Sequence, residues 1–293
     1  MSLEKKFELK EKIEKRNIGD ILVTRHSDRK GDYLTEYGRE HARKDTKDIY
    51  SKYYGDYEIV KSGGSNAGGK VKVDGMEMGR ALETANIIAD TLAGKDKYKT
   101  RERKELSYET IISEMPYNHK EIYDSYLPEN FSELSDDEKV YYSKIANKKT
   151  SDYFFSLDTE KAKKYKEEVA GAFSTLIENQ TNILLRLNSK DKVLLPMGAH
   201  GVMMPIFLQQ TLIREIDGKE VLGFNSLDEI GGDFDPVEGF AVSINVDEDG
   251  NIVEYNIRFF DEKRPGVPMK LDIEKIHSLA EKYREIHNEK PYK

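Results

Sequence analysis

The chain has 293 residues, with 47 Lys plus Arg against 55 Asp plus Glu, which gives a formal net charge of -8. This acidic balance supplies no long-range positive field and therefore argues against a nucleic-acid partner or an anionic membrane surface. The sequence contains no cysteine, which excludes disulfides, thiol catalysis and cysteine-ligated zinc. The length suffices for a sizeable core, and we expect a single domain over residues 1–293.

The sequence leaves localisation open. No apolar run approaches the roughly 20 residues of a membrane helix, and the opening MSLEKKFELKEKIEKRN is charged rather than signal-like. A cytoplasmic location is weakly favoured, and export is the alternative if a signal peptide has been trimmed. The oligomeric state is equally open.

The first predicted strand contains the apolar run at residues 21–23, a pattern typical of a strand buried on both faces. The chain becomes polar directly afterwards, at Arg25, His26 and Arg29. In open α/β sheets, ligands bind outside the carboxyl ends of the strands. We therefore expect these three side chains to line a crevice with positive charge, which suits a phosphate group.

A helix is predicted next, because Thr35 can cap it and apolar residues follow at helical spacing. A short strand around Ile59 and Val60 then leads into a glycine-rich stretch, which we expect to be a loop. A phosphate-binding P-loop is not favoured there, since Gly69-Lys70 is followed by Val71 rather than by Ser or Thr.

Three further features follow in chain order. GRALETANIIADTLAG predicts a helix that closes at Gly94, with Arg80 at its start, where free N–H groups and the helix dipole favour an anion. The stretch from about 107 to 190 is rich in Tyr, Lys and Glu, and we expect a helical insertion or cap. Residues 193–195 predict a strand that leads to His200, followed by an apolar helix with Pro205 in its first turn.

The C-terminal part alternates between apolar and polar residues, which predicts a hairpin that turns at Asp249-Gly250. A charged helix is expected from about Asp272. His200 is thus a second histidine at the carboxyl end of a predicted strand, and the α/β topology would bring it to the same edge as His26.

Four motifs now carry a resemblance. TRHSDR resembles the Arg-His-Gly-x-Arg motif of the histidine phosphatase superfamily, which has the phosphoglycerate mutase-like fold. LTEYGREHAR is similar to the family's Leu-Thr-x-x-Gly-x-x-Gln-Ala helix, RALETANIIA to its Arg-Ala-x-Gln-Thr-Ala helix, and GAHG to its second-histidine loop. The ordered matches span about residues 21–201. The resemblance implies an α/β protein, a three-layer α/β/α sandwich with a mainly parallel sheet and the helical insertion.

The resemblance also implies roles. His26 would be the nucleophile and become transiently phosphorylated, while Arg25, Arg80 and His200 would hold the phosphoryl oxygens. Arg29 matches the additional arginine of the acid phosphatase branch. These roles suit the chemistry, because guanidinium groups donate charge-assisted, bidentate hydrogen bonds to phosphate oxygens. No metal and no organic cofactor are implied.

A general acid has to protonate the leaving alkoxide. In the mutase branch this acid is a Glu before an apolar residue, some two dozen residues beyond the second arginine. Glu105-Leu106 in RERKELSYET lies at that distance, so Glu105 is the preferred candidate, with Glu109 second and Glu102 third. A solvated Glu in a run of charges is the alternative interpretation of Glu105.

The chain departs from the family pattern at several positions. Ser27 replaces the Gly after the nucleophile, where its hydroxyl could donate to the phosphate or narrow the site. His41 and Glu83 replace Gln in the two helix motifs, and we expect both to support packing. Gly201 follows the second histidine where the acid phosphatase branch has Asp, which favours the mutase-like branch.

His119, His277 and His287 lie in polar or charged contexts and are interpreted as surface residues. No His-x-x-x-His spacing exists, so a metal site is not favoured, and EIGGDFDPVEG is interpreted as a plain loop rather than a calcium loop. The favoured function is hydrolysis of a small phosphate monoester through phospho-His26. A phosphomutase and a non-catalytic phosphate-ester-binding module are the alternatives, and the substrate itself is open.

Overall fold

The computed structural model describes residues 15–95, 97–187, 192–261, 263–264 and 269–288. Its central element is a ten-stranded mixed sheet. The strand order is β11-β10-β14-β13-β12-β1-β9-β5-β8, and β4 pairs with β9 beside this path. The strands of this sheet are β1 (Arg16–Arg25), β4 (Glu58–Ile59), β5 (Lys61–Gly64), β8 (Lys99–Glu102), β9 (Val193–Ala199), β10 (Leu212–Ile216), β11 (Lys219–Leu222), β12 (Gly239–Val246), β13 (Ile252–Phe259) and β14 (Met269–Leu271). Two separate hairpins pair β2 (Arg29–Lys30) with β3 (Tyr33–Leu34), and β6 (Lys70–Val73) with β7 (Met76–Gly79).

The sheet has a parallel half and an antiparallel half. β1, β9, β5, β8 and β4 pair in parallel, whereas every pairing from β1 through β12 to β11 is antiparallel. The α/β class expected from the sequence is therefore confirmed. The parallel half is the part that brings several strand ends to one edge.

The helices are α1 (Glu36–Asp45), α2 (Ser51–Tyr54), α3 (Arg80–Ala93), α4 (His119–Ser125), α5 (Asp136–Ser156), α6 (Glu160–Leu187), α7 (Met203–Thr211) and α8 (Ile273–His287). A π-helical turn, η2 (Thr46–Tyr50), joins α1 to α2, and the 3-10 turns are η3 (Lys104–Leu106), η4 (Tyr108–Thr110), η5 (Phe131–Glu133) and η6 (Leu227–Ile230). The two predicted caps are confirmed: Thr35 accepts an N-terminal backbone N–H group of α1, and Gly94 closes α3. The helix expected from about Asp272 is α8, and Asp272 caps it.

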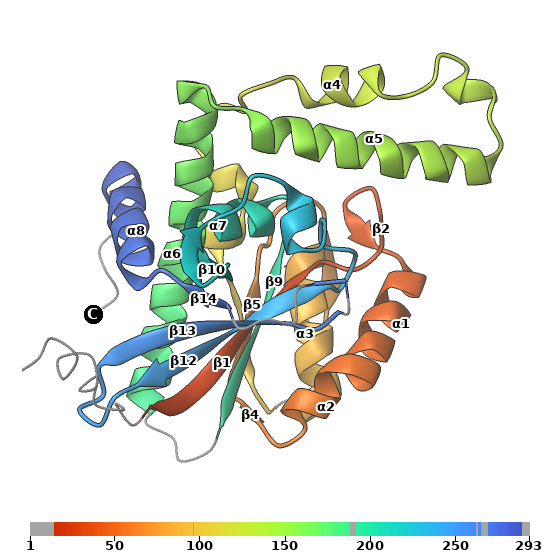
Figure 1. The fold of residues 1–293 in the computed structure, drawn as a ribbon. Helices are drawn as coiled ribbons and strands as arrows, with labels where there is room; N and C mark the ends of the chain where they lie inside the picture. Colours follow the sequence, from red (N-terminus) through yellow and green to blue (C-terminus); the bar gives the residue numbers. More distant parts are fainter. Residues whose placement is uncertain (1–14, 96, 188–191, 262, 265–268, 289–293) are drawn as a thin grey trace, which may run out of the picture.

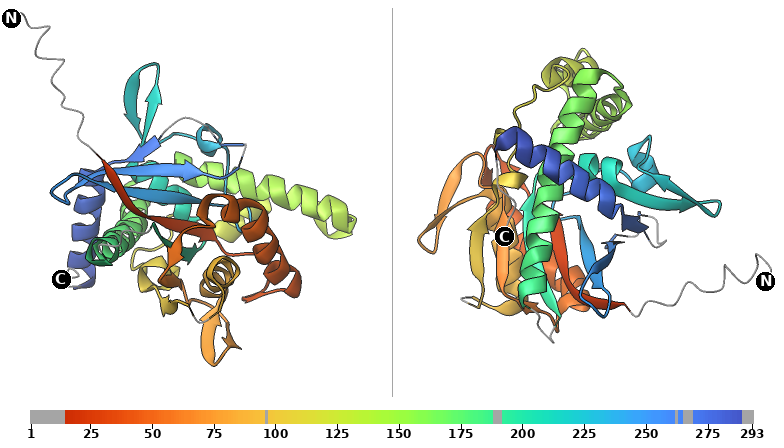
Figure 2. Two further views of the ribbon diagram at one scale, coloured as in Figure 1. Left: turned by 90° about the horizontal axis from the view of Figure 1, so that it is seen from below. Right: turned by 90° about the vertical axis from the view of Figure 1, so that its left-hand side faces the viewer.

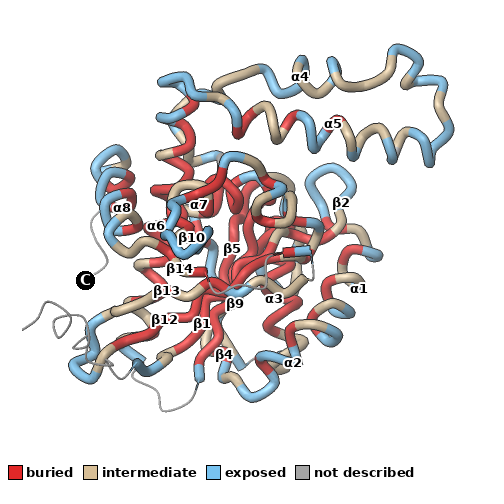
Figure 3. The backbone as a smooth tube through the Cα atoms, viewed as in Figure 1, coloured by how far each residue is buried: buried red, intermediate tan, exposed pale blue. Residues whose placement is uncertain are grey.

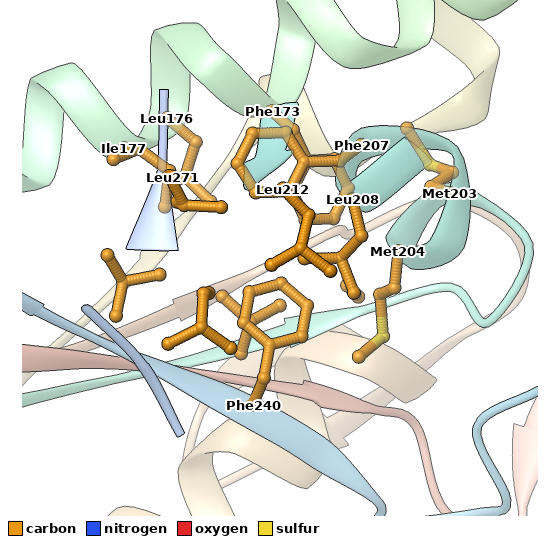
Figure 4. Close-up of a cluster of buried hydrophobic side chains, with 14 of the residues drawn as sticks. Phe173, Leu176, Ile177, Met203, Met204, Phe207, Leu208, Leu212, Phe240 and Leu271 are labelled. Carbon is orange, nitrogen blue, oxygen red and sulfur yellow. The ribbon is translucent and has the colours of Figure 1, made fainter. Parts of the chain in front are cut away.

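Two hydrophobic cores cover the two faces of the sheet, as the alternation of side chains along a strand requires. Ile21 and Val23 of β1 join the core under α6 and α7, while Leu22 joins the core under α1 and α3. Figure 1 shows α6 and α8 on one side of the sheet and α1 to α3 on the other, and Figure 2 gives two further views of these layers. Figure 4 shows the first core, where Phe173 and Phe207 stack above Phe240. The molecule is the expected three-layer sandwich.

The helical stretch expected at about 107–190 has two structurally different parts. α4 and α5 project from the body above the sheet, and Figure 3 shows them exposed or half-buried over most of their length. α6 is instead buried along one side and packs into the core through Val169, Phe173 and Leu176. The projecting part thus ends near residue 157, and α6 belongs to the sandwich.

The glycine-rich stretch is only in part the loop that the sequence predicts, because the irregular segment is confined to residues 65–69. Gly63 and Gly64 belong to β5 and pair in parallel with Met197 and Gly198 of β9. Beyond them, residues 70–79 form the β6–β7 hairpin. The glycines lie in the strand because neighbouring backbone passes too close for side chains, a constraint that composition alone does not reveal.

Within the described part of the chain, no helix is both long and apolar enough to cross a membrane. Most of the N-terminal segment on which the expectation about localisation depends lies outside the described residues.

Candidate active site

The two predicted histidines meet at the carboxyl ends of β1 and β9. The strands pair in parallel up to Arg25 and Ala199, and the His26 N–H then donates to the Ala199 carbonyl at 3.0 Å. The rings of His26 and His200 lie edge to face, with their centroids 5.5 Å apart. Both side chains are buried. Residues 174 positions apart in the sequence are thereby joined into one site.

The backbone fixes how His26 presents its ring. Its Nδ1 lies 2.9 Å from the Ser27 carbonyl oxygen, and since a carbonyl only accepts, Nδ1 carries the proton and Nε2 keeps its lone pair. Burial lowers the pKa of His26 to about 4, with Arg80 and Arg25 lowering it further and the Ser27 hydrogen bond opposing them. At neutral pH the ring is therefore uncharged, as a nitrogen nucleophile has to be.

His200 is held by a residue that the sequence analysis did not single out. Its Nε2 lies 3.0 Å from Ser65 Oγ, and the Ser65 N–H donates to the Gly198 carbonyl at 3.1 Å. Burial lowers the pKa of His200 to about 3, and His26 and Arg80 add to the effect. Ser65 was missed because it follows the glycines that the sequence analysis interprets as a loop.

The side chain of Arg25 packs against Gly201, the glycine that follows His200. The Arg25 guanidinium donates to the Phe234 carbonyl, and its aliphatic and Nε atoms lie against Gly201. A Cβ at position 201 would stand 2.8 Å from Arg25 Nε. The missing side chain at Gly201 thus makes room for Arg25 beside the histidines.

Arg80 reaches the site because α3 begins against the sheet. A Cβ on Gly198 would stand 1.8 Å from the Ala81 carbonyl oxygen, so only glycine lets the first turn of α3 approach β9 this closely. Arg80 is buried, and its Nη1 donates to Asp32 Oδ1 at 3.1 Å. Asp32 is more than half exposed, so an incoming phosphate can replace it on the guanidinium at little cost.

Ser27 lies at the site but is turned away from a phosphate. Its hydroxyl donates to the Gly38 carbonyl at 2.7 Å, and its N–H donates to Thr84 Oγ1 at 3.1 Å. The residue is fully buried. The expectation that the Ser27 hydroxyl donates to phosphate does not fit this arrangement, because the hydroxyl already joins the end of β1 to α1.

Arg29 occupies the exposed β2–β3 hairpin, where its Nη1 donates to the Gly31 carbonyl at 2.6 Å. Its charge contributes to the lowered pKa values of His26 and His200. Arg29 therefore lies close enough to add positive potential to the site without being buried in it.

Glu105, the acid that the spacing favours, is held by a side chain of α6. Its Oε1 accepts from Asn179 Nδ2 of α6 at 3.0 Å. Burial lowers the pKa of Lys61 to about 8, with two neighbouring arginines acting in the same direction and Glu105 opposing them. Lys61 is the first residue of β5.

Glu109 is held by the backbone of Gly68 rather than by α6. Its Oε1 accepts from the Gly68 N–H at 3.2 Å, and a Cβ on Gly68 would stand 3.4 Å from Arg80 Nη1 and 3.3 Å from Asp32 Oδ1. Glu102 lies 3.5 Å from Asn66 Nδ2. Of the three candidates, Glu109 is the one hydrogen-bonded to Gly68, which lies beside Arg80.

Two replaced motif residues support the surroundings of the site, as expected. Glu83 Oε1 accepts from Arg39 Nε at 2.7 Å, which ties α3 to α1. His41 bridges Asp28 at 2.5 Å and Asp45 at 3.0 Å. A hollow of about 510 Å³ adjoins this bridge and includes Lys144 of α5, while His26 lies outside its lining.

Among the described residues, no three or more His, Cys, Asp or Glu side chains are grouped as a metal would need. His119 and His277 are exposed, as predicted. His287 is a correction: its side chain is 12% exposed and its Nε2 lies 3.2 Å from Glu168 Oε1. Charged neighbours in the sequence concealed the fact that one face of α8 packs against α6.

The comparisons with known proteins found no family model and no curated protein that matches the chain. Several solved structures match over most of its length. The phytase from D. castellii is 12% identical, with 95% of this chain and 83% of that chain covered and a TM-score of 0.45. The Hafnia alvei phytase apo form is 10% identical, covering 94% and 98%, with a TM-score of 0.40. A Plasmodium falciparum phosphoglycerate mutase is 12% identical, covering 83% and 99%, with a TM-score of 0.29.

TM-scores below 0.5 carry no weight in assigning a fold or a function. The class of the protein follows instead from its own layers and strand order: an α/β sandwich with two neutral histidines and two arginines at the carboxyl edge of its parallel strands.

Proposed function

We propose that the protein is a phosphatase that hydrolyses phosphate monoesters through a phosphohistidine at His26, without a metal ion. The observation that carries the proposal is the state of His26, a buried, uncharged imidazole whose Nδ1–H is held by a backbone carbonyl. Its Nε2 lone pair stands among cationic side chains that favour a phosphate dianion. A ring held in this way is prepared for attack on phosphorus.

In the first step, Nε2 of His26 forms a bond to phosphorus as the bond to the leaving oxygen breaks. The ring becomes positively charged, and the Ser27 carbonyl at Nδ1 stabilises that charge. Arg25 and Arg80 offset the charge on the phosphoryl oxygens, with Asp32 displaced from Arg80. His200 donates a third hydrogen bond, because the dianion raises the low proton affinity that this ring has in the free protein.

The leaving alkoxide takes a proton from Glu109. We assign this role to Glu109 rather than Glu105 because Glu109 is bound to Gly68, which lies beside Arg80, whereas Glu105 is bound to Asn179 of α6. In the second step, water gives a proton to the Glu109 carboxylate and attacks phosphorus, and the bond to Nε2 breaks. Inorganic phosphate leaves, and His26 returns to its neutral form.

The proposal is tested by turnover of p-nitrophenyl phosphate and glycerol 2-phosphate in excess EDTA. We expect His26→Ala to lower kcat on both substrates by about 10³-fold or more, because the covalent route is lost. His119→Ala is the matched control, since it removes an exposed histidine from α4, and it should leave kcat unchanged.

Full activity in His26→Ala, or loss of activity on chelation that added metal restores, would overturn the proposal. Transfer of the phosphoryl group to a second alcohol rather than to water would identify a phosphomutase. Tight binding of phosphate esters without any turnover would identify a binding module.

A further inference from the structure

We infer that Glu168 of α6 is a positioning residue for the proton transfer: its carboxylate clamps the segment that follows Glu109 and so holds Glu109 at Gly68. The inference rests on the proposed function, because it deepens the role given there to Glu109. It concerns a side chain that lies outside the proposed phosphate site and has no hydrogen bond or ion pair with His26 or His200 among the described residues.

The clamp consists of two successive backbone hydrogen bonds. Glu168 Oε1 accepts from the Ile112 N–H at 2.6 Å, and Oε2 accepts from the Ser113 N–H at 2.8 Å. The Glu168 side chain is 2% exposed, and His287 Nε2 lies 3.2 Å from Oε1. Hydrogen bonds from N–H groups to an ionised carboxylate are short and about twice as strong as neutral ones.

Hydrophobic burial fixes this segment only in part. Ile111 is half-buried against the core, but Ile112 is 65% exposed even though it is apolar, and Glu109 is exposed too. The fully buried Leu106 anchors the chain upstream of Glu109, while downstream the carboxylate holds the backbone on the far side of Ile111. Removal of the carboxylate therefore leaves the half-buried Ile111 to hold the downstream side.

α8 braces the clamp. The His287 ring lies 4.1 Å from the Tyr283 ring, and the Tyr283 hydroxyl is 3.4 Å from Thr110 Oγ1. Thr110 Oγ1 also donates to the Ser107 carbonyl at 2.7 Å. Two helices of the sandwich therefore converge on residues 110–113, which follow Glu109.

A carboxylate at this buried place has a cost that an apolar side chain would not have, since its charge is removed from water. What the carboxylate provides is direction: two acceptor oxygens fix two consecutive N–H groups and hence the orientation of the backbone. Orientation matters most where a proton donor has to lie within hydrogen-bond reach of the leaving oxygen.

The first test compares Glu168→Gln with Glu178→Gln. Glu178 lies on the same helix and binds Arg284 and His277 of α8, but it does not contact the 107–113 segment. We expect Glu168→Gln to lower kcat for glycerol 2-phosphate roughly tenfold, because alkoxide departure needs the acid. The kcat for p-nitrophenyl phosphate, whose phenolate leaves without help, should change less than about twofold, and Glu178→Gln should change neither.

The second test asks whether Glu168 acts through Glu109. In a Glu109→Gln background, Glu168→Gln should cause no further loss on glycerol 2-phosphate, because the two residues then share one effect. Equal losses on both substrates, or a loss that persists in the Glu109→Gln background, would show a merely structural role. If Glu109→Gln itself spares alkyl turnover while His26→Ala abolishes it, the clamp inference is overturned and the phosphatase proposal stands.

A third readout does not depend on activity. The Gly68 N–H donates to Glu109 and has no contact with Glu168 among the hydrogen bonds of the described residues. We expect Glu168→Gln to accelerate amide hydrogen exchange at Gly68 as well as at residues 112 and 113, whereas unchanged exchange at Gly68 would contradict the clamp. If Glu168→Gln unfolds, Ser113→Pro removes one clamp donor while keeping the carboxylate, and it should accelerate exchange at Gly68 and at residue 112.

Discussion

The histidine and arginine half of the site and the segment that carries the proposed acid are built in opposite ways. The histidines and Arg80 are buried and are fixed by strand pairing and by the contact of Gly198 with α3. Glu109 is exposed, on a short turn held by hydrogen bonds. The first half is determined by packing of the fold, and the second depends on a few contacts, so single substitutions should separate the two.

The largest effect that tests this contrast comes from substituting each of the two acid candidates separately. Glu109→Gln should lower kcat for glycerol 2-phosphate by about 10²-fold, the usual loss for a general acid, whereas Glu105→Gln should stay within about threefold of the wild type. Steady-state kinetics on this substrate and on p-nitrophenyl phosphate measure both. A larger loss in Glu105→Gln would return the acid to the position that the sequence spacing favours.

The same contrast explains what the sequence could predict. The first strand, the caps of α1 and α3, the start of α8 and the convergence of His26 with His200 follow from local patterns that packing enforces. The choice among the acidic residues does not. Glu102, Glu105 and Glu109 occupy one charged stretch, and only the tertiary partners of each, Asn66, Asn179 and Gly68, distinguish them.

Ser65 and Asp32 were missed for a related reason. Each lies in a stretch whose glycines and polar residues predict only a loop, and its role depends on a partner far away in the chain. Gly201 is a different case, because its absent side chain makes room for Arg25 and so cannot be interpreted from a motif alone.

A smaller expected effect concerns the pH at which buried and exposed histidines titrate. The pKa of His26 is lowered to about 4 and that of His200 to about 3, mainly by burial, whereas the hydrogen bond to Glu178 raises the pKa of exposed His277. In an NMR titration of the free protein, His277 should titrate above 6.5 and the two site histidines only near the acid end. Site histidines that titrate near 6.5 would mean that the pocket is open to water.

These shifts have a consequence for stability with a defined sign. Between about pH 4 and 6.5 the unfolded chain binds a proton at position 26 that the folded protein does not. The free energy of unfolding should therefore decrease as the pH falls through this window. Urea unfolding of the wild type and of His26→Gln should show a shallower decrease in the variant.

The central claim is a covalent bond between phosphorus and His26. The most direct measurement is to mix the protein with p-nitrophenyl phosphate, quench during turnover in alkaline denaturant to preserve the labile phosphoramidate, and locate the phosphoryl group by peptide mass spectrometry. The account predicts one phosphoryl group on His26 in the wild type and none in His26→Ala. Turnover with no phosphorylated histidine, or with the phosphoryl group on His200, would contradict it.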